Sequence, residues 1–195
     1  MRPHLLLAVV LLGSFASAGA FGADADGYFT VKGAGAADCR AYSAAVSERG
    51  PAFISFGGWI EGYLSAVNRY EEGVYDIAGW RGTEALMASI ARFCAENPGV
   101  RFHDVIVRLA GQLRATALTA QSQPVEVAGE AGSMTVPAEV LRRVQQRLYE
   151  RGIYTGEVDG HWSPATLEAL QAFQEAKGLP GHGLPDQQTL VQLLP

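Results

Sequence analysis

Residues 156–194 read GEVDGHWSPATLEALQAFQEAKGLPGHGLPDQQTLVQLL and hold one short pattern twice. Each copy begins with a side chain that favours the N-cap of a helix and continues with leucines at helical spacing. The two copies are Ser163, Thr166, Leu167 and Leu170, then Asp186, Thr189, Leu190 and Leu193. Pro164 suits the first helical position, because an N–H group there would have no acceptor within the helix. The stretch therefore predicts a duplicated turn-and-helix unit.

A third helix precedes this duplicated unit and completes a small module. Its apolar residues recur at helical spacing from about Pro137 to Arg151, and Gly152 stops it. Gly178 ends the helix that follows Ser163. The three apolar stripes are Leu141, Val144 and Leu148; Leu167, Leu170 and Phe173; and Leu190 and Leu193. Because no stripe is buried without the others, residues 134–195 are predicted to form a three-helix module with an internal repeat.

Many positions of this module follow one known order and spacing. They are Val144, Gln145, Leu148, Gly152, Tyr154, Gly156, Val158, Asp159, Gly160, Trp162, Pro164, Thr166, Ala169, Phe173, Gln174, Gly178, Leu179, Gly183, Asp186, Thr189 and Leu193. In these positions the segment resembles the bacterial peptidoglycan-binding domain of the three-helix type. Ser163 and Trp162 depart from the usual glycine and phenylalanine, but serine caps helices and tryptophan fills an aromatic slot. The resemblance implies noncovalent binding of cell-wall glycan and stem peptide, without cleavage.

Arginines recur every four residues along the first helix of the module, at Arg143, Arg147 and Arg151. This spacing places them on one side of the helix, away from its apolar stripe. Guanidinium groups can hold carboxylates by two parallel hydrogen bonds, so we expect the stripe to engage the acidic groups of a peptide stem. The alternative interpretation is a solvated basic face that Glu139 and Glu150 partly neutralise.

The turn before the second helix offers a different binding surface. Tyr154, Asp159 and His161 are expected at the surface, where amphipathic rings and polar groups suit contact with a sugar. Trp162 is a further candidate contact, although burial in the core is the favoured interpretation. Together with Arg147, the first three residues are the leading predicted contacts, in a shallow groove between the repeated units.

Two glutamines and two histidines of the module allow further roles. Gln145 and Gln174 can bond either loop backbone or ligand, and we favour the structural role. Zinc ligation by Asp159, His161 and His182 is an alternative to solvated turns, but these residues lack a compact ligand spacing. We therefore expect neither a metal nor a cofactor.

Residues 1–20 have the pattern of a secretory signal peptide, with a basic residue, an apolar core and small residues at the cleavage region. The apolar run is too short to span a membrane. We therefore expect a cleaved signal and a periplasmic protein without a membrane span. Residues 119–133 lose the apolar period and contain Pro124, which predicts a flexible linker between residues 27–118 and the module.

Residues 27–118 carry four helical patterns separated by glycine and proline. The helices are expected at about 36–48, from the Gly50–Pro51 break to about 70, from Thr83 to the stop at Pro98, and at about 102–117. Cys39 and Cys94 are the only cysteines, and an oxidising compartment lets them pair, with free buried thiols as the alternative. The predicted fold class is all-α: a disulfide-closed four-helix bundle followed by the three-helix module.

A second set of residues marks the bundle. It comprises Trp59, Gly62, Tyr63, Leu64, Ser65, Asn68, Tyr75, Asp76, Ile77, Leu86, Phe93, Cys94, Asn97 and Pro98. Over about 28–115 these residues resemble a family of small exported helical proteins related to acid-activated periplasmic chaperones and secretion-immunity proteins. The resemblance supports the fold and the compartment more than a task, and a periplasmic protein partner of the bundle belongs to the alternative function. The alternative function is an immunity-type inhibitor of a wall-degrading toxin, or an acid-stress chaperone, localised by the wall-binding module.

Charge and motifs narrow the function classes. The formal net charge of −5 argues against a nucleic-acid partner. The sequence contains no nucleophile elbow, zinc-protease helix or phosphate-binding glycine loop. Glycosidic cleavage needs two placed carboxylates, and the local candidates Glu61, Glu71, Glu72 and Asp76 are more typical of solvated turns. We predict a binding protein rather than an enzyme, with a cryptic wall hydrolase as the competing hypothesis.

Overall fold

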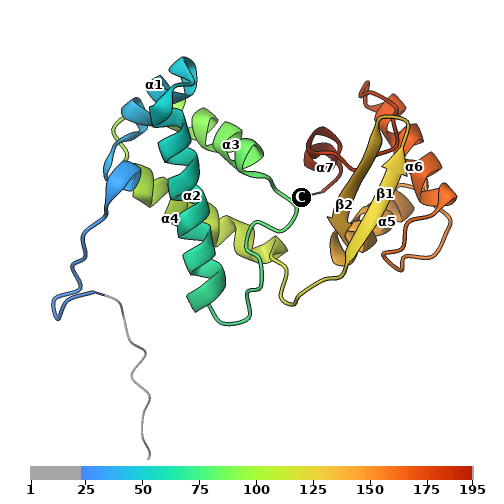
Figure 1. Ribbon diagram of the computed structural model, residues 1–195, viewed down its shortest axis with the longest axis horizontal. Coiled ribbons are helices and arrows are strands. Elements are labelled where there is room, and N and C mark those ends of the chain that lie inside the picture. Colours follow the sequence, from blue (N-terminus) through green and yellow to red (C-terminus); the bar gives the residue numbers. More distant parts are fainter. Residues whose placement is uncertain (1–22, 195) are drawn as a thin grey trace, which may run out of the picture. The chain divides into compact units, whose positions relative to one another are not determined.

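The structure, a computed structural model, describes residues 23–194 (Figure 1). The predicted signal peptide, residues 1–20, lies outside the described residues. The chain divides into a short unit, residues 1–30, and a large compact unit, residues 31–195. In the short unit the carboxylate of Asp24 accepts hydrogen bonds from two backbone amides that follow it. The helices and strands of residues 23–194 all belong to the large unit.

The first part of the large unit is helical. Its elements are the 3-10 helix η1 (Gly33–Ala36), α1 (Cys39–Glu48), α2 (Pro51–Tyr70), α3 (Thr83–Glu96), α4 (Phe102–Leu113) and the 3-10 helix η2 (Arg114–Thr116). The carboxylate of Asp38 accepts the amide N–H of Ala41 and so caps α1. Pro51 occupies the start of α2, where no N–H donor is needed. The four predicted helices are confirmed, and these elements are called the helical bundle below.

Aromatic rings and a disulfide hold the helical bundle together. Tyr42, Phe56 and Phe102 contact one another with ring centroids between 4.7 and 5.1 Å apart. The buried Tyr42 hydroxyl donates a hydrogen bond to a backbone carbonyl of α3 at 2.7 Å. Cys39 and Cys94 form the predicted disulfide, which links α1 to α3. The disulfide prediction is therefore confirmed.

The C-terminal module contains three helices and one hairpin, which can be followed in Figure 1. Its elements are β1 (Pro124–Gly129), β2 (Gly132–Pro137), α5 (Ala138–Glu150), α6 (Pro164–Ala176) and α7 (Gln187–Leu193). The predicted N-caps are present, because the side chains of Ser163 and Asp186 accept the amide N–H groups of Thr166 and Thr189. The apolar stripes of α5, α6 and α7 meet in one core. The predicted three-helix module with two capped repeats is confirmed.

The hairpin corrects the prediction of a flexible linker at residues 119–133. β1 and β2 pair in antiparallel register from Pro124 opposite Pro137 to Gly129 opposite Gly132. Val127 and Val136 are buried in the core of the module, and the intervening side chains are mostly exposed. Val125 and Met134 pack partly buried against the same core. Each strand thus has only two inward apolar residues, an alternation too short to stand out against the polar composition.

Two residues from outside the C-terminal module complete its core. Trp80, in the loop between α2 and α3, and Leu118, after η2, are buried with the apolar residues of the module. The backbone of Leu118 pairs with Asp76 as an isolated β-bridge. The side-chain amide of Gln187 on α7 donates to the carbonyl of Trp80 at 2.7 Å and accepts the N–H of Gly82 at 2.9 Å. The loop between α2 and α3 is thereby fixed against α7.

The described residues are mostly helical, and their only sheet is the two-stranded hairpin. This agrees with the predicted all-α fold class. Within residues 23–194, the helices lack the combination of length and apolar character that a membrane crossing requires.

Candidate functional site

Gln145 of α5 organises the turn that precedes α6. Its side chain is fully buried, and its Oε1 accepts the backbone N–H groups of Asp159 and Gly160 at 3.1 and 2.8 Å. Its Nε2 donates to the carbonyl of His161 at 2.9 Å and lies 3.3 Å from the hydroxyl of Thr166. Both halves of the amide are therefore used inside the protein, which confirms the structural role predicted for this glutamine.

Gln174 of α6 repeats the arrangement at the turn that precedes α7. It is also fully buried, and its Oε1 accepts the N–H of Gly183 at 2.7 Å. Its Nε2 donates to the carbonyl of Leu184 at 2.8 Å and to the hydroxyl of Thr189 at 2.9 Å. In each copy, a glutamine from the preceding helix binds the turn and the helical threonine after the N-cap. The sequence repeat is thus a repeat of one hydrogen-bonded structure.

Each turn also contains a glycine at a position where any other residue would strain the backbone. Gly160 and Gly183 have positive φ angles of 79° and 76°, a region that other residues rarely adopt. A Cβ atom on Gly160 would lie 2.6 Å from the carbonyl oxygen of Ala138, and one on Gly183 would overlap the side chain of Leu167. Backbone angle and close approach therefore both require glycine at these equivalent positions.

The first turn presents Asp159 and His161 at the surface. The side chain of His161 is 82% exposed, and its Nδ1 lies 3.1 Å from Oδ2 of Asp159. The other carboxylate oxygen accepts the backbone N–H of His161 at 2.8 Å. Hydrogen bonding from this N–H holds the pKa of Asp159 below its ordinary value. The pair offers a carboxylate and an imidazole to a ligand on a turn that Gln145 fixes.

Two predicted contacts of this turn, Tyr154 and Trp162, pack against the core of the module. Tyr154 is only 4% exposed, and its hydroxyl donates to the carbonyl of Glu157 at 2.8 Å. Its ring joins the core because the turn folds back over α5, so the expectation of a surface group is corrected. Trp162 is half-buried and packs against the same core, in line with the favoured interpretation.

The arginines of α5 do not form one continuous stripe. The guanidinium of Arg143 donates to the carbonyls of Thr116 and Ala117 at 2.6 and 3.1 Å. Arg147 donates to Glu150 at 2.8 Å, and the guanidinium of Arg151 lies over the ring of Phe173 at 5.4 Å. No interaction among the described residues joins Arg147 to Asp159 or His161. The predicted contacts are therefore not joined to one another by hydrogen bonds or ion pairs in the described part of the chain.

Arg143 and Arg147 line a cavity of about 290 Å³ that sequence reasoning did not find. Its walls are Trp80, Ala115, Thr116, Arg142, Arg143, Gln146, Arg147, Glu150 and Leu194. We call this cavity the arginine pocket. Arg142 and Gln146 were missed because helical spacing alone singled out every fourth residue. Trp80 was missed because its loop is distant in sequence, and only the folded chain brings it to α5.

Acidic side chains hold part of the arginine charge in place. Glu139 accepts hydrogen bonds from Arg142 at 2.7 and 2.8 Å and from Arg143 at 3.0 Å. The bonds from Arg142 lower the pKa of Glu139 against the opposing effect of its partial burial. Hydrogen bonds from Gln146 and then Arg147 lower the pKa of Glu150. Both carboxylates are therefore negatively charged at neutral pH.

The histidines of the two turns pair separately. His161 lies beside Asp159, whereas Nε2 of His182 lies 3.2 Å from Oδ2 of Asp186. Nδ1 of His182 accepts the backbone N–H of Leu184 at 3.0 Å. Within residues 23–194, no group of three or more histidine, cysteine, aspartate or glutamate side chains is placed to hold a metal ion.

Comparison with known proteins identifies the C-terminal segment. Residues 138–193 match the family model described as "Putative peptidoglycan binding domain". The match begins with α5 and ends with α7, and it confirms the resemblance found in the sequence of this segment. It supports peptidoglycan binding at the level of the domain, and the family is a binding domain, not a catalytic one. Neither the search of curated proteins nor that of solved structures found a match.

Proposed function

We propose that the protein is a non-catalytic peptidoglycan-binding protein of the periplasm, and that its C-terminal module tethers the helical bundle to the cell wall. The observation that carries this proposal is the family match over residues 138–193, at the segment where two glutamine-bound turns repeat. Cell-wall polymer is the partner that the match implies. The location follows from that polymer together with the signal-like pattern of residues 1–20.

The rigid turns are well suited to recognition without catalysis. Gln145 and Gln174 satisfy the backbone groups of both turns internally, so the exposed groups are held before a ligand arrives. Binding then orders few additional side chains, which lowers the entropic cost of association. Asp159 and His161 are the leading contacts on the turn, with the half-buried Trp162 beside them in sequence. Arg143 and Arg147, which line the arginine pocket, are further contacts.

Sedimentation with insoluble murein sacculi tests the proposal. The full mature chain is expected to pellet with sacculi and to stay in solution without them. Replacement of the exposed imidazole by His161→Ala is expected to weaken sedimentation several-fold, because removal of a good polar contact costs about 1 kcal/mol or more. Lys177→Ala, at an exposed position after α6, is the matched control and should sediment like the unaltered chain. Failure of the unaltered chain to pellet would overturn the proposal.

The same incubation separates binding from cleavage. After prolonged contact with the protein, the supernatant is analysed for soluble muropeptides by chromatography. A tether releases none beyond the buffer control, whereas a hydrolase releases them in proportion to time and protein concentration. Release that persists after repurification would contradict the non-catalytic part of the proposal.

Fractionation of cells, with N-terminal sequencing of the mature protein, tests the periplasmic location.

A further inference from the structure

The tip of the hairpin lies on one of the two repeated turns. Glu130, between β1 and β2, donates its backbone N–H to the carbonyl of His182 at 3.2 Å, in the turn that precedes α7. Nε2 of Gln171 on α6 lies 3.5 Å from Oε1 of the same glutamate. A Cβ atom on Gly129 would overlap the carbonyl oxygen of His182, so the backbone of β1 passes close to this turn. One acidic residue thus contacts the second turn through both its N–H and its carboxylate.

The turn that precedes α6 has the same backbone positions. In this first turn, the N–H of His161 donates to the carboxylate of Asp159 at 2.8 Å. In the second turn, the N–H of Leu184 donates to Nδ1 of His182 at 3.0 Å. Asp159 and His182 also each precede the glycine whose N–H the buried glutamine accepts. The carbonyl of Asp159 is therefore the counterpart of the carbonyl that binds Glu130.

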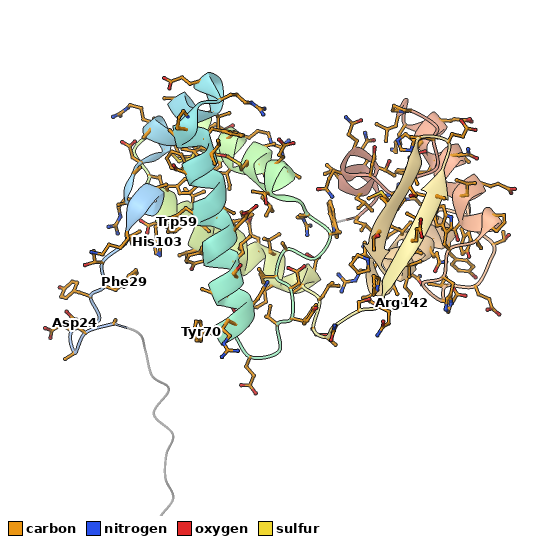
Figure 2. The ribbon with its side chains drawn as sticks, viewed as in Figure 1. Asp24, Phe29, Trp59, Tyr70, His103 and Arg142 are labelled. Atoms are coloured by element: carbon orange, nitrogen blue, oxygen red, sulfur yellow. A yellow bond between two sulfur atoms is a disulfide. The ribbon has the colours of Figure 1, made fainter. Side chains whose placement is uncertain are left out.

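The helix beside each turn supplies a matching side chain. Arg142 on α5 and Gln171 on α6 each lie three positions before the buried glutamine of their helix. A Cβ atom built on the turn glycine would lie 3.5 Å from Cβ of Arg142 in the first copy and 3.1 Å from Cγ of Gln171 in the second. Arg142, labelled in Figure 2, therefore has the same place beside the first turn as Gln171 has beside the second.

The first turn is open where the second turn is covered. Leu184 is 7% exposed, whereas the side chain of its counterpart His161 is 82% exposed. In the described part of the chain, no hydrogen bond uses the carbonyl of Asp159. Nε and Nη2 of Arg142 bind a carboxylate on the same helix, and its Nη1 has no partner among the described residues. The groups that contact the hairpin tip at the second turn thus have unused counterparts at the first.

We propose that the first turn binds an acidic residue of a peptide in the way that the second turn binds Glu130. The N–H of that residue donates to the carbonyl of Asp159, and its carboxylate accepts a hydrogen bond from Nη1 of Arg142. This inference rests on the proposed function and deepens it, because it names the peptide part of the wall polymer, and not the glycan, as the partner of this turn.

Hydrogen bonds, more than net charge, carry the fit at the first turn. Glu139 accepts two bonds from Arg142, at 2.7 and 2.8 Å, which offset its positive charge. The carboxylate of Asp159 contacts the backbone N–H and the ring of His161. A further bond from the guanidinium to a ligand carboxylate is stronger than a bond between neutral groups. Loss of either the N–H or the carboxylate of the ligand is therefore expected to weaken binding.

A probe that copies Glu130 as a free molecule tests the site. N-acetyl-glutamate N-methylamide carries the same amide N–H and the same carboxylate, and it is added to the full mature chain at neutral pH. The backbone amide resonances of both turns are followed by NMR. The probe is expected to shift the signals of Gly160 and His161 in the first turn. Those of Gly183 and Leu184 stay in place, because the hairpin already occupies the second turn.

Two altered probes each remove one group. The glutamine analogue lacks the carboxylate, and the analogue methylated on the glutamate amide nitrogen lacks the N–H. Each is expected to bind about fivefold more weakly than the original probe, because one hydrogen bond is lost. N-acetylglucosamine stands for the glycan and is expected to leave the Gly160 signal in place at the same concentration.

Arg142→Leu and Gln171→Leu form a matched pair of variants, because they alter equivalent positions of the two copies. Arg142→Leu is expected to weaken binding of the glutamate probe about fivefold, through loss of the bond from Nη1. Gln171→Leu should leave this binding unaltered, since its side chain serves the covered turn. Arg142→Lys keeps a charged donor and is expected to bind the probe more tightly than Arg142→Leu. Thermal melting of each variant shows whether it is folded.

Several outcomes would overturn the inference. They are larger shifts at the second turn than at the first, equal binding of the glutamate probe and its two analogues, and stronger binding of N-acetylglucosamine. Shifts of Gly160 and His161 that depend on protein concentration without any probe would also overturn it, because they would show that the hairpin tip of a second copy fills the first turn.

Failure of this inference is distinguishable from failure of the proposed function. If the chain pellets with sacculi while the glutamate probe shifts neither turn, the assignment of the first turn to peptide is wrong and the wall-binding function stands. If the chain does not pellet but the probe binds the first turn with the expected preferences, the assignment of the turn is correct and the proposed function is wrong.

Discussion

Two buried glutamine side chains carry more of the architecture than their residue type suggests. Gln145 and Gln174 are fully buried, and each bonds both donors and acceptors of a turn. Their role was predictable from the sequence because both occupy matching places before a turn that contains glycine. Their partners were not predictable, since hydrogen bonds across 14 or 16 residues depend on how the turn folds back.

Replacement of Gln145 by leucine tests this role at the level of one residue. The change leaves the N–H groups of Asp159 and Gly160 and the carbonyl of His161 without their partner. We expect Gln145→Leu to lower the free energy of unfolding by at least about 2 kcal/mol, because each buried unsatisfied group costs about 1–3 kcal/mol. Urea unfolding followed by circular dichroism measures the loss. Gln146→Leu, at the neighbouring position, should stay within about 0.5 kcal/mol.

Acid should weaken the cap of α7. Partial burial by itself would raise the pKa of Asp186, but bonds from Thr189 and the proximity of His182 outweigh it, so the pKa lies below its ordinary value. A carboxyl whose pKa is lowered by folding stabilises the protein above the pKa of the unfolded chain, about 3.9, and loses that effect as the pH falls through the folded value. The loss of stability caused by Asp186→Asn should therefore be largest at neutral pH.

The measurement is the melting temperature of both chains from pH 7 to pH 2. The gap between them is expected to narrow below about pH 4. Asp186→Ala, which also removes the capping oxygen, should cost about 1 kcal/mol at neutral pH. A gap that widens in acid would show that the Asp186 carboxyl is not stabilised in its charged form.

At the level of elements, the helices were predictable and the hairpin was not. Leucines at helical spacing and strong caps marked α5, α6 and α7, and proline and glycine marked the ends of α2 and α3. β1 and β2 each carry one buried valine, Val127 and Val136, and one partly buried apolar residue, Val125 and Met134, within a polar, glycine-containing stretch. That composition is equally typical of a linker. Tertiary contact with α5, not local preference, makes this segment a hairpin.

The repeated turns predict matched effects of glycine replacement. Gly160→Ala and Gly183→Ala place a Cβ at positive φ and in contact with neighbouring atoms. Each change is expected to lower the free energy of unfolding by about 1–3 kcal/mol. Gly99→Ala is the control, since nothing lies within 4 Å of the added atom and its φ is not positive. Stability that is unchanged in both turn variants would contradict the proposed backbone constraint.

At the level of the whole molecule, the described residues contain two cores that meet at the loop between α2 and α3. The ligand contacts predicted from sequence all lie on the C-terminal module, and Arg143, Arg147, Asp159 and His161 are among those with exposed or partly exposed side chains. Trp80 could not be assigned to that module from sequence, because 58 residues separate it from the family-matched segment that begins at residue 138. The boundary between residues 27–118 and the module stays a prediction.

On the helical bundle, the ring centroids of Trp59 and His103, both labelled in Figure 2, lie 6.1 Å apart.

The disulfide of the helical bundle joins residues that are 55 positions apart in the sequence. In the chain-entropy account, closing a loop of that length stabilises the folded state by about 4 kcal/mol. Replacement of Cys39 and Cys94 by alanine should therefore lower the melting temperature of the bundle substantially. A melting temperature unaffected by this double change would show that the covalent link adds nothing to stability.

Binding to purified sacculi is compared for the full chain and for its Gln145→Leu/Gln174→Leu variant. We expect the unaltered chain to pellet with sacculi and the variant, whose two turns are unsupported, to stay in the supernatant. Parallel samples without sacculi identify any pelleting by aggregation. Equal, sacculus-dependent pelleting of both chains would contradict the claim that the two glutamine-bound turns carry recognition of the wall.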